Sequence, residues 1–376
     1  MRILCWSELF WPYIGGAEVF AARMLSAWVA RGHDPVVVTA HDWLNLPDAD
    51  AYCGAPIHRF PFRTAIKGRD IELIHTLRRR VGDLVRRLRP DLYFLNGVGP
   101  SVLFLEAARA AHPAPLLAQL NQEVLGSQVP GTGSVLGRVL STADWVVSVS
   151  QEALDHAQAM APDIARRCSM IPYGMTLPEL APAPLPFAPP VVLCLGRLVP
   201  YKGFDVAAQA VARSRHRLPK LRLLIAGDGE CRAALERQVN EAGLAAATTF
   251  LGWVEPDDVP AILNQATLVV MPSRREGLPL VALQASAMAR PIVATRAGGL
   301  PEIVVDGETG ILIEKDDGDG LADAITLLLE HPAQATQMGT AGRERCRTHF
   351  SWDHCVDAYE ALCASLRRQD QATALA

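Results

Sequence analysis

Residues 267–288, TLVVMPSRREGLPLVALQASAM, contain the end of one structural element and the beginning of the next. The apolar run 267–272 predicts a buried strand, and Pro279, which suits the first position of a helix, precedes residues with helical spacing. The Arg-Pro pair at 290–291 ends that helix, and the apolar run 291–295 predicts another strand. A strand, a helix and a strand within about thirty residues form a βαβ unit, so both strands belong to a parallel sheet.

The same alternation of short apolar runs and longer amphipathic segments extends over the whole chain. It predicts parallel sheets covered by helices, the α/β class of doubly wound folds. The proline-rich segment 171–190 interrupts the alternation. Because proline is excluded from helix interiors and central strands, we interpret it as a semi-rigid linker between two domains, residues 1–177 and 188–352. The expected strands are 2–6, 35–40, 91–96, 115–120 and 145–150 in the first domain, and 191–196, 221–227, 247–253, 267–272, 291–295 and 309–314 in the second.

The bulk composition is that of a soluble cytoplasmic enzyme. Half of the 376 residues are hydrophobic, enough for a sizeable core, and the net charge of −4 gives no reason to expect nucleic acid as a partner. The eight cysteines form no C-x-x-C pair, which favours reduced thiols over disulfides or a zinc site. Glu8 interrupts the apolar residues of the N-terminus, so we expect no signal peptide, and no apolar run approaches the ~20 residues of a membrane span.

The turn after the expected strand 191–196, GRLVPYKGFDVAAQAV (196–211), combines two cations with two glycines. Arg197 and Lys202 precede a helix that begins near Phe204. Free backbone amides and the positive end of a helix dipole attract anions, so these features together predict an anion-binding turn. The alternative is a solvated loop with ordinary basic residues, and this turn by itself does not decide between the two.

The turn 273–276, Ser-Arg-Arg-Glu, lies between the expected strand 267–272 and the next helix. The amides of Leu280 and Val281 lie at the positive end of that helix, and Glu276, just outside it, is placed to accept hydrogen bonds from sugar hydroxyls. Gln284 follows in the second turn of the helix. The alternative is that Glu276 only interacts with the helix dipole and that Gln284 is an ordinary exposed residue.

In the first domain, Gly15 and Gly16 follow the expected strand 2–6 and precede a helix. Two glycines allow a ligand to approach the backbone closely, although a Gly-Gly pair alone is a weak motif. Ligands of doubly wound sheets bind beyond the carboxyl ends of the strands. We therefore expect a site in a cleft between the domains, with the glycine pair on one side and the cationic turns on the other.

These three turns and a further Gly-Gly turn at 297–304, in this order and spacing, resemble those of the family-4 retaining glycosyltransferases with the GT-B fold (glycosyl transferases group 1): GGAEVFA (15–21), GRLVPYKGFD (196–205), PSRREGLPLVALQASA (272–287) and AGGLPEIV (297–304). The resemblance also includes ADWVVSVSQEALDHA (143–157), MIPYGM (170–175) and FSWDHCVDAYEALCASL (350–366), and so spans nearly the whole chain. It implies two Rossmann-like doubly wound parallel-sheet domains that face each other across a cleft. It further implies that the second domain binds a nucleotide-sugar donor, that the first binds the acceptor, and that a C-terminal helix, about 353–376, packs back on the first domain.

The resemblance also implies roles for individual residues. Arg197 and Lys202 would hold the donor diphosphate, and Glu276 would contact sugar hydroxyls; these are the expected catalytic residues. The other expected binding residues are Gly277, Leu278, Leu280 and Val281 in the sugar-phosphate pocket, Gln284 at the ribose, Val254 at the base, Asn121 near the donor sugar, and Gly15 and Gly16 on the phosphate and acceptor side. The nucleotide diphosphate sugar is a co-substrate, and we expect no metal ion or other cofactor.

Three positions depart from the usual residues of the family. Its second glutamate, eight positions after the first, is Gln284 here, which can hydrogen bond a ribose but lacks a charge. A glycine two positions after Gly277 is replaced by Pro279, which removes one amide from the pocket. A histidine that many members carry near the donor sugar is replaced by Asn121, which cannot transfer a proton at neutral pH. These departures leave the general mechanism intact and the identity of the donor open.

We therefore expect a retaining glycosyltransferase that moves a hexosyl unit from a nucleotide diphosphate sugar to a glycan or lipid-linked acceptor, in the synthesis of cell-surface polysaccharide or glycolipid. The sequence offers no well-placed protein nucleophile, so the expected course is attack on the face that the diphosphate leaves. Stabilising negative charge on that leaving group is then the main task of the enzyme. A nucleotide-sugar epimerase would need paired acids and a histidine, which Gln284 and Asn121 do not supply. A non-catalytic nucleotide-sugar binding protein is the other alternative.

The segment 75–90, HTLRRRVGDLVRRLRP, carries six arginines at partly helical spacing. An ordinary solvated helix is the simpler interpretation. The alternative is a patch that touches anionic lipid headgroups, which would make the enzyme peripheral to the inner face of the cell membrane.

Two other kinds of short motif are only weak indications of a metal site or a dinucleotide site. The Asp-x-Asp strings at 48–50 and 317–319 are similar to metal-binding sequences but lie in acidic loops away from the cationic turns. The segment 131–137, GTGSVLG, misses the G-x-G-x-x-G spacing of dinucleotide sites by one residue and follows Pro130 rather than a strand, so we do not expect an NAD enzyme.

Overall fold

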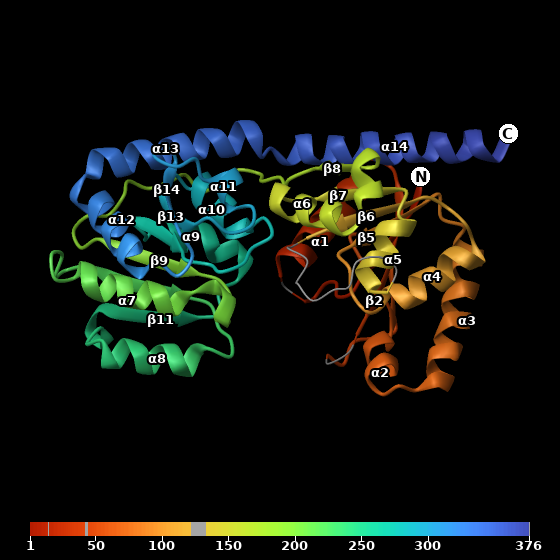
Figure 1. The fold of residues 1–376 in the computed structure, drawn as a ribbon, viewed down its shortest axis with the longest axis horizontal. Helices are drawn as coiled ribbons and strands as arrows, with labels where there is room; N and C mark the ends of the chain where they lie inside the picture. The colour runs from red at the N-terminus through yellow and green to blue at the C-terminus, as the bar shows by residue number, and fades with distance from the viewer. Residues whose placement is uncertain (14, 42–43, 122–132, 376) are drawn as a thin grey trace. The chain divides into compact units, whose positions relative to one another are not determined.

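The computed structural model describes residues 1–13, 15–41, 44–121 and 133–375. Contacts within the chain divide it into two compact units (Figure 1). The first unit comprises Met1–Pro172 and Cys355–Ala376, and the second comprises Tyr173–His354. Each is built on a sheet of mainly parallel strands with helical crossovers, which confirms the doubly wound α/β class that the alternation of apolar runs predicts.

The first unit contains an eight-stranded sheet in the order β3-β4-β2-β1-β5-β6-β7-β8. Neighbouring strands are parallel, except that β3 and β4 are antiparallel. Three strands, β3, β4 and β8, are additional to those expected, because they are short or carry polar residues and so lack an apolar run. The strands are β1 (Arg2–Ser7), β2 (Asp34–Ala40), β3 (Ala49–Tyr52), β4 (Ala55–Phe60), β5 (Leu92–Asn96), β6 (Leu116–Leu120), β7 (Trp145–Ser148) and β8 (Cys168–Met170).

Helices cover this sheet and bury its aromatic side chains. The ring of Phe62 stacks on Trp6 with centroids 5.4 Å apart and on Phe104 with centroids 4.5 Å apart, which joins β1 to helices α2 and α4. Asp70 caps α3 by accepting a hydrogen bond from the Leu73 amide at 2.9 Å. The helices are α1 (Gly16–Ala30), α2 (Phe62–Lys67), α3 (Ile71–Leu88), α4 (Val102–Ala111), α5 (Val135–Thr142) and α6 (Gln151–Met160), followed by the short 3₁₀ helix Pro162–Arg166.

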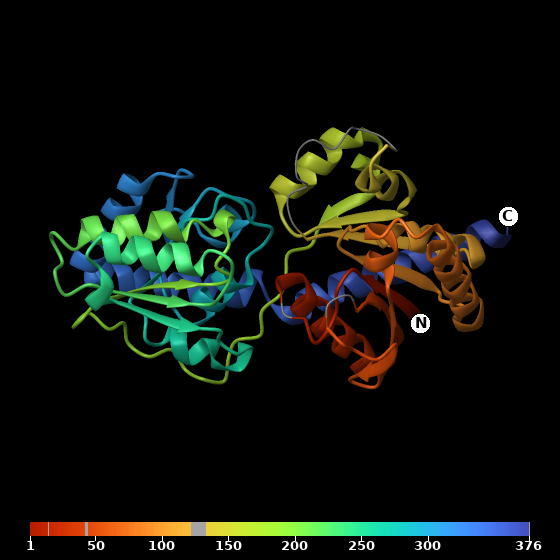
Figure 2. The same cartoon turned by 90° about the horizontal axis from the view of Figure 1, so that it is seen from below.

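The last helix, α14 (Trp352–Leu375), lies along the first unit in both views (Figures 1 and 2). Tyr359 is fully buried between Phe20 and Phe94, with ring centroids 5.7 and 5.9 Å away. Its hydroxyl donates to Gln119 Oε1 at 2.6 Å. Glu360 accepts a hydrogen bond from His33 Nε2 at 2.8 Å. These contacts account for the assignment of residues 355–376 to the first unit.

The second unit contains a six-stranded parallel sheet in the order β11-β10-β9-β12-β13-β14. Its strands correspond to the six expected from the sequence: β9 (Val191–Leu195), β10 (Arg222–Ala226), β11 (Thr248–Gly252), β12 (Leu268–Met271), β13 (Ile292–Thr295) and β14 (Gly310–Ile313). The helices are α7 (Phe204–Ser214), α8 (Arg232–Glu241), α9 (Val259–Leu263), α10 (Leu280–Ala287), α11 (Leu300–Ile303), α12 (Gly318–Glu330) and α13 (Pro332–His349). Three 3₁₀ helices, η2 (Pro200–Lys202), η3 (Ala245–Ala247) and η4 (Pro256–Asp258), lie in its loops.

The proline-rich segment 171–190 is held by the second unit over much of its length. The buried Arg290 donates to the carbonyl oxygens of Ala266, at 2.8 Å, and Ala183. Asn264 donates to the Ala181 carbonyl at 3.0 Å and accepts from the Ala183 amide at 2.9 Å. Burial also lowers the pKa of Arg290 to about 10. The second unit begins at Tyr173 and so includes most of this segment.

Each sheet has a position where the order of strands reverses. In the second unit, β9 is followed by β10 on one side and β12 on the other, and in the first unit β1 lies between β2 and β5. Loops that leave such neighbouring strands diverge to opposite faces and leave a crevice at the carboxyl ends, where ligands of these folds bind. The loops after β9 and β12 are those that the sequence singles out.

Two glycines allow the loops of the second unit to touch. Gly203 has φ of +67°, and a Cβ atom there would lie 1.9 Å from the Pro272 carbonyl oxygen at the end of β12. Gly298, after β13, has φ of +54°, and a Cβ atom there would lie 2.0 Å from the Glu276 carbonyl oxygen. The neighbouring Gly299 amide donates to the Gly277 carbonyl at 2.6 Å. The turn formed by Gly298 and Gly299 thus supports the backbone of the loop that carries Glu276.

We predict that Gly298→Ala destabilises the protein more than Gly307→Ala does. Gly307 also has a positive φ, +78°, but nothing lies within 4 Å of a Cβ atom built there. Both variants incur about 1–2 kcal/mol of left-handed strain, and Gly298→Ala adds overpacking of about 1–3 kcal/mol. Unfolding of the two variants in urea measures the difference, and equal shifts of the midpoint would show that Gly298 makes no close contact with the loop.

Candidate functional site

The carboxyl ends of β9 and β12 carry an ion pair that is almost buried. Lys202 ends the 3₁₀ helix η2 after β9, and Glu276 lies in the loop after β12. Lys202 Nζ donates to Glu276 Oε1 at 2.6 Å, and the two side chains are only 15% and 7% exposed. Because β9 and β12 are the strands between which the order reverses, this pair lies at the expected ligand-binding edge of the second sheet.

Hydrogen bonds from the same loop and its neighbour hold Glu276 in place. Ser273 Oγ donates to Glu276 Oε1 at 2.7 Å, so one carboxylate oxygen accepts from both an ammonium and a hydroxyl. Thr295, at the end of β13, donates to the Ser273 carbonyl. A buried carboxylate is tolerated only with such partners.

Tyr201 is the common neighbour of three cations. Arg197 Nη2 donates to the Tyr201 hydroxyl at 2.7 Å. The Lys202 ammonium lies 5.9 Å from the centre of the Tyr201 ring, and the Arg275 guanidinium carbon lies 5.3 Å from it. The electron-rich face of an aromatic ring stabilises nearby cations. The structure therefore brings Arg197 and Lys202 to one side chain, and their contact with a donor diphosphate stays a prediction.

Helix α10 begins at Leu280, and Pro279 is its N-cap residue with extended backbone, φ −74° and ψ 117°. The expectation that proline occupies the first helical position is wrong by one residue, since the Pro279 carbonyl already accepts the first helical hydrogen bond, from Ala282 at 3.0 Å. The amides of Leu280 and Val281 are still the first two of the helix and have no carbonyl of their own helix to bind. They lie within five residues of Glu276 in sequence, with Gly277 and Leu278 between.

The other predicted residues of the second unit lie at the same edge of the sheet. Gln284 is half-buried in α10, one turn beyond Leu280. Val254 is half-buried and follows β11 by two residues. Their contacts with a ribose and a base stay predictions.

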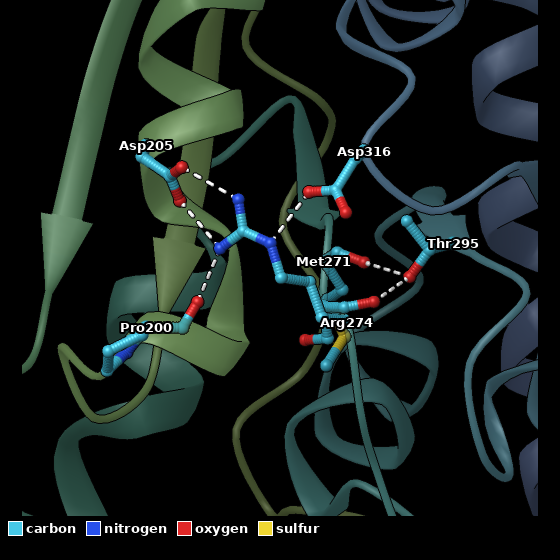
Figure 3. Close-up of polar contacts among 7 residues, drawn as sticks. Pro200, Asp205, Met271, Arg274, Thr295 and Asp316 are labelled. Carbon is cyan, nitrogen blue, oxygen red and sulfur yellow. Dashed lines mark hydrogen bonds and ion pairs between the residues drawn. The ribbon is translucent and has the colours of Figure 1, made fainter.

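Arg274 connects the Glu276 loop to two other segments (Figure 3). Its Nη1 and Nη2 donate to the two carboxylate oxygens of Asp205 at 3.1 and 2.8 Å, and its Nε donates to Asp316 Oδ1 at 2.6 Å. Nη1 also donates to the Pro200 carbonyl at 2.5 Å. The hydrogen bonds to Asp205, aided by Asp316, raise the pKa of the Arg274 guanidinium above its ordinary value.

The predicted residues of the first unit meet in a network of neutral side chains. Asn121, after β6, donates to Asn96 Oδ1 at 3.1 Å, and Asn96 at the end of β5 donates to the Ala17 carbonyl at 3.1 Å. Ala17 is the second residue of α1, which begins at Gly16 with Gly15 as its N-cap. Asn96 thus connects the Gly-Gly turn to Asn121. Gly15 has extended backbone, φ −156°, and a Cβ atom built there would clash with the Glu18 carboxylate, so its contact with a phosphate or acceptor stays a prediction.

Four residues that the sequence motifs do not single out complete these two clusters: Tyr201, Ser273, Asn96 and Gln119. Ser273 and Tyr201 lie in the same turns as Glu276 and Lys202, and a polar residue in a turn after a buried strand is the signal that indicates them. Asn96 ends the expected strand 91–96 and carries the same signal. Gln119 lies inside a strand, is fully buried, and donates to Asn96 Oδ1 at 3.3 Å and to Asn121 Oδ1. A single glutamine within an apolar run is only a weak indication of a site residue. Its importance becomes clear from its burial and its hydrogen bonds in the structure.

The carboxylates of the two Asp-x-Asp strings have protein partners. Asp50 pairs with the buried Arg59 at 3.0 Å, and Asp48 lies 3.2 Å from His41 Nε2. Asp317 caps α12 through the Gly320 amide at 2.8 Å, and Asp319 pairs with Arg213. Among the described residues, no group of three or more His, Cys, Asp or Glu side chains is arranged to hold a metal ion. The segment 131–137 lies partly outside the described residues.

Within the described ranges, none of the helices combines the length and the apolar character needed to cross a bilayer. Helix α3 is amphipathic, with Leu77, Val81 and Val85 buried. The six arginines of segment 75–90 are all exposed: Arg78, Arg79, Arg80, Arg86, Arg87 and Arg89.

Two family models match the chain, each over most of one unit. The model described as Glycosyltransferase Family 4 matches residues 14–177, and the model described as Glycosyl transferases group 1 matches residues 181–345. The first match includes Gly15, Gly16 and Asn121, and the second includes Lys202 and Glu276.

Individual relatives match nearly the whole chain. A GDP-mannose-dependent alpha-(1-6)-phosphatidylinositol monomannoside mannosyltransferase of Mycolicibacterium smegmatis is 32% identical over 365 residues, which are 91% of this chain and 93% of the relative. Sucrose-phosphate synthase of Thermosynechococcus elongatus has a similar fold, with a TM-score of 0.81 and 22% identity over 97% of this chain and 99% of that one. HepE of Anabaena, solved with UDP and glucose, gives a TM-score of 0.79 and 20% identity over 97% and 100% of the two chains. The matched families and the extent of these similarities show that the chain belongs to the family-4 glycosyltransferases and has their GT-B fold.

Proposed function

We propose that the protein is a retaining glycosyltransferase that moves a hexosyl unit from a nucleotide diphosphate sugar to a glycan or lipid-linked acceptor. The observation that carries this proposal is the Lys202–Glu276 ion pair at the point where the strand order of the second sheet reverses. A cation there is suited to a diphosphate, and a carboxylate beside it is suited to sugar hydroxyls. The amides of Leu280 and Val281 add donors at a helix N-terminus.

The proposed reaction needs charge stabilisation more than it needs a nucleophile. The bond between the anomeric carbon and the diphosphate oxygen breaks, the acceptor oxygen bonds to the same face, and the acceptor proton passes to the departing diphosphate. Negative charge grows on that diphosphate, and donors that already point at it lower the barrier because they need not reorganise. Lys202, with Arg197 at the rim, supplies this charge in our proposal. Glu276, held by Ser273, orients the sugar.

The relatives are consistent with a nucleotide-sugar donor without fixing its base. The mycobacterial relative is named for GDP-mannose, and HepE was solved with UDP. Gln284 offers an amide to the ribose and Asn121 a neutral group to the sugar. Membership of the family favours transfer over epimerisation and over binding alone. We propose an acceptor in cell-surface polysaccharide or glycolipid synthesis, since the mycobacterial relative acts on a phosphatidylinositol mannoside.

A panel of nucleotide sugars tests the proposed function. We expect one of them to raise the melting temperature by mass action, and the same compound, incubated without acceptor, to release free sugar and nucleoside diphosphate slowly. An epimerase would instead form a new nucleotide sugar, and a binding protein would leave the compound unchanged. Stabilisation by none of the compounds would contradict a donor site in the second unit.

Replacing either proposed phosphate ligand is predicted to lower turnover. We expect Arg197→Ala and Lys202→Gln to reduce kcat by about 100-fold or more, as removal of an oxyanion donor does. The glutamine can still hydrogen bond Glu276, which protects the fold from an unpaired buried carboxylate. Arg296→Ala, which removes an exposed pair with Asp306, is the control and should keep wild-type turnover. Steady-state rates near wild type in a folded Arg197 or Lys202 variant would overturn the assigned role.

The exposed arginines of α3 support a second, separable proposal. Arg86 pairs with Asp83 and Arg80 lies 3.5 Å from Asp48, whereas Arg78, Arg79 and Arg87 form no ion pair among the described residues. Unpaired cations on the exposed face of a helix whose apolar face packs on the protein core suit anionic headgroups. We propose peripheral contact between this face and an anionic membrane, which would serve a lipid-linked acceptor.

Liposome flotation with and without anionic lipid tests this contact. We expect binding to anionic vesicles to fall by on the order of 100-fold in the variant with Arg78, Arg79 and Arg87 replaced by Gln, since each basic residue adds about 1 kcal/mol near such a surface. The matched control replaces three exposed arginines of the second unit, Arg217, Arg222 and Arg237, by Gln and changes the net charge equally. Equal loss in both variants, or no lipid-dependent flotation of the wild type at moderate salt, would contradict the proposal.

A further inference from the structure

Arg274 binds the chain on both sides of Lys202. Before Lys202, its backbone amide donates to the Tyr201 carbonyl at 2.8 Å and its Nη1 to the Pro200 carbonyl at 2.5 Å. After Lys202, its guanidinium forms a paired contact with the carboxylate of Asp205, in the first turn of α7. Figure 3 shows Pro200 and Asp205 on one side of the guanidinium and Asp316 on the other. Residue 274 thus holds the five-residue path from Tyr201 to Asp205 at both ends.

The path contains the junction between η2 and α7. Gly203, the residue after Lys202, lies between η2 and α7 and has positive φ, and glycine allows more backbone conformations than any other residue. Within the proposed reaction, an entering diphosphate competes with Glu276 for the Lys202 ammonium. The Lys202–Glu276 bond therefore cannot by itself fix the ammonium once the donor is bound. A contact that the donor does not disturb is needed.

The Arg274 contacts are suited to that task. An arginine fork on a carboxylate forms two parallel hydrogen bonds and fixes direction as well as distance, which a lysine cannot do. The side chain is 32% exposed, so its contacts are only partly screened by water. Asp205 is itself anchored, because its carbonyl accepts a hydrogen bond from Gln238 of α8 at 2.8 Å. Asp316, after β14, holds the guanidinium from a third segment at 2.6 Å.

We propose that Arg274 is a positioning residue that fixes the Lys202 ammonium against the leaving diphosphate. It acts through Lys202, by joining the loop after β12 to η2 and α7, and it does not itself touch the donor. This inference rests on the proposed function, in which Lys202 stabilises the leaving group. Its consequence is that Arg274 contributes to catalysis only while Lys202 is present.

A double-variant cycle tests this dependence. Arg274→Ala is expected to lower kcat by about 10- to 100-fold with the KM for the donor changed by less than about 3-fold, as for a group that is misplaced in the transition state. In the Lys202→Gln background the same substitution is expected to cause no further loss beyond about 2-fold. Arg274→Lys should recover only part of the rate. Losses that multiply in the double variant would overturn the proposal.

Hydrogen exchange gives a readout that does not depend on activity. Peptides that cover residues 197–206 should exchange faster in Arg274→Ala than in the wild type, while peptides of the first unit keep their rates. Arg213→Ala, which removes another ion pair of α7, with Asp319, is the matched control and should leave kcat and these peptides unchanged. Unchanged exchange in Arg274→Ala, or an equal effect of Arg213→Ala, would show that Arg274 does not hold this path. Wild-type turnover of Lys202→Gln alone would refute the proposed role of Lys202, and the exchange result would still decide whether Arg274 holds the segment.

Discussion

The ion pair between Lys202 and Glu276 is the constraint around which the second unit is arranged. Removing a carboxylate and an ammonium from water costs several kcal/mol each unless both are well paired, and replacing such a pair by apolar residues often stabilises a protein. Its presence at the carboxyl ends of β9 and β12 therefore indicates a role in function and not a contribution to stability. The surrounding residues compensate the cost: Ser273 shares the carboxylate, Gly298 supports its backbone, and Arg274 holds the loop beside it.

The two units differ in the chemistry of their sheet edges. The second unit presents charged groups, with cations gathered at Tyr201 and a carboxylate beside them. In the first unit, a cluster of neutral amides and hydroxyls surrounds Asn96, which bonds to Ser7, Ala17 and Asn121, and Glu8 follows β1 and accepts from the Ser101 amide. Paired cations suit stabilisation of a leaving diphosphate, whereas neutral amides suit the orientation of hydroxyls. In our proposal the second unit therefore binds the donor and the first binds the acceptor.

The sequence was sufficient for the fold class and for the loops that carry the site, because buried parallel strands are apolar runs and their turns are rich in glycine and charge. It was insufficient where partners are distant along the chain. Arg274 pairs with Asp205 and Asp316, and the residues that flank Arg274 in the sequence do not predict either ion pair. Strands β3, β4 and β8 lack apolar runs, and the proline-rich segment is held by Arg290, more than a hundred residues away. The position of Pro279 was predicted wrongly by one residue. A proline at the N-cap and a proline at the first helical position look alike in a sequence.

The packing of Tyr359 and Glu360 on the first unit has a consequence for biosynthesis. The second unit is one continuous stretch, residues 173–354, whereas the first is split and takes in residues 355–376. On the ribosome, the segments of the first unit emerge before the second but lack the helix that buries Phe20 and Phe94 and satisfies Gln119. The first unit therefore cannot complete its core until its last helix has been synthesised, whereas every residue of the second unit precedes that helix in the chain.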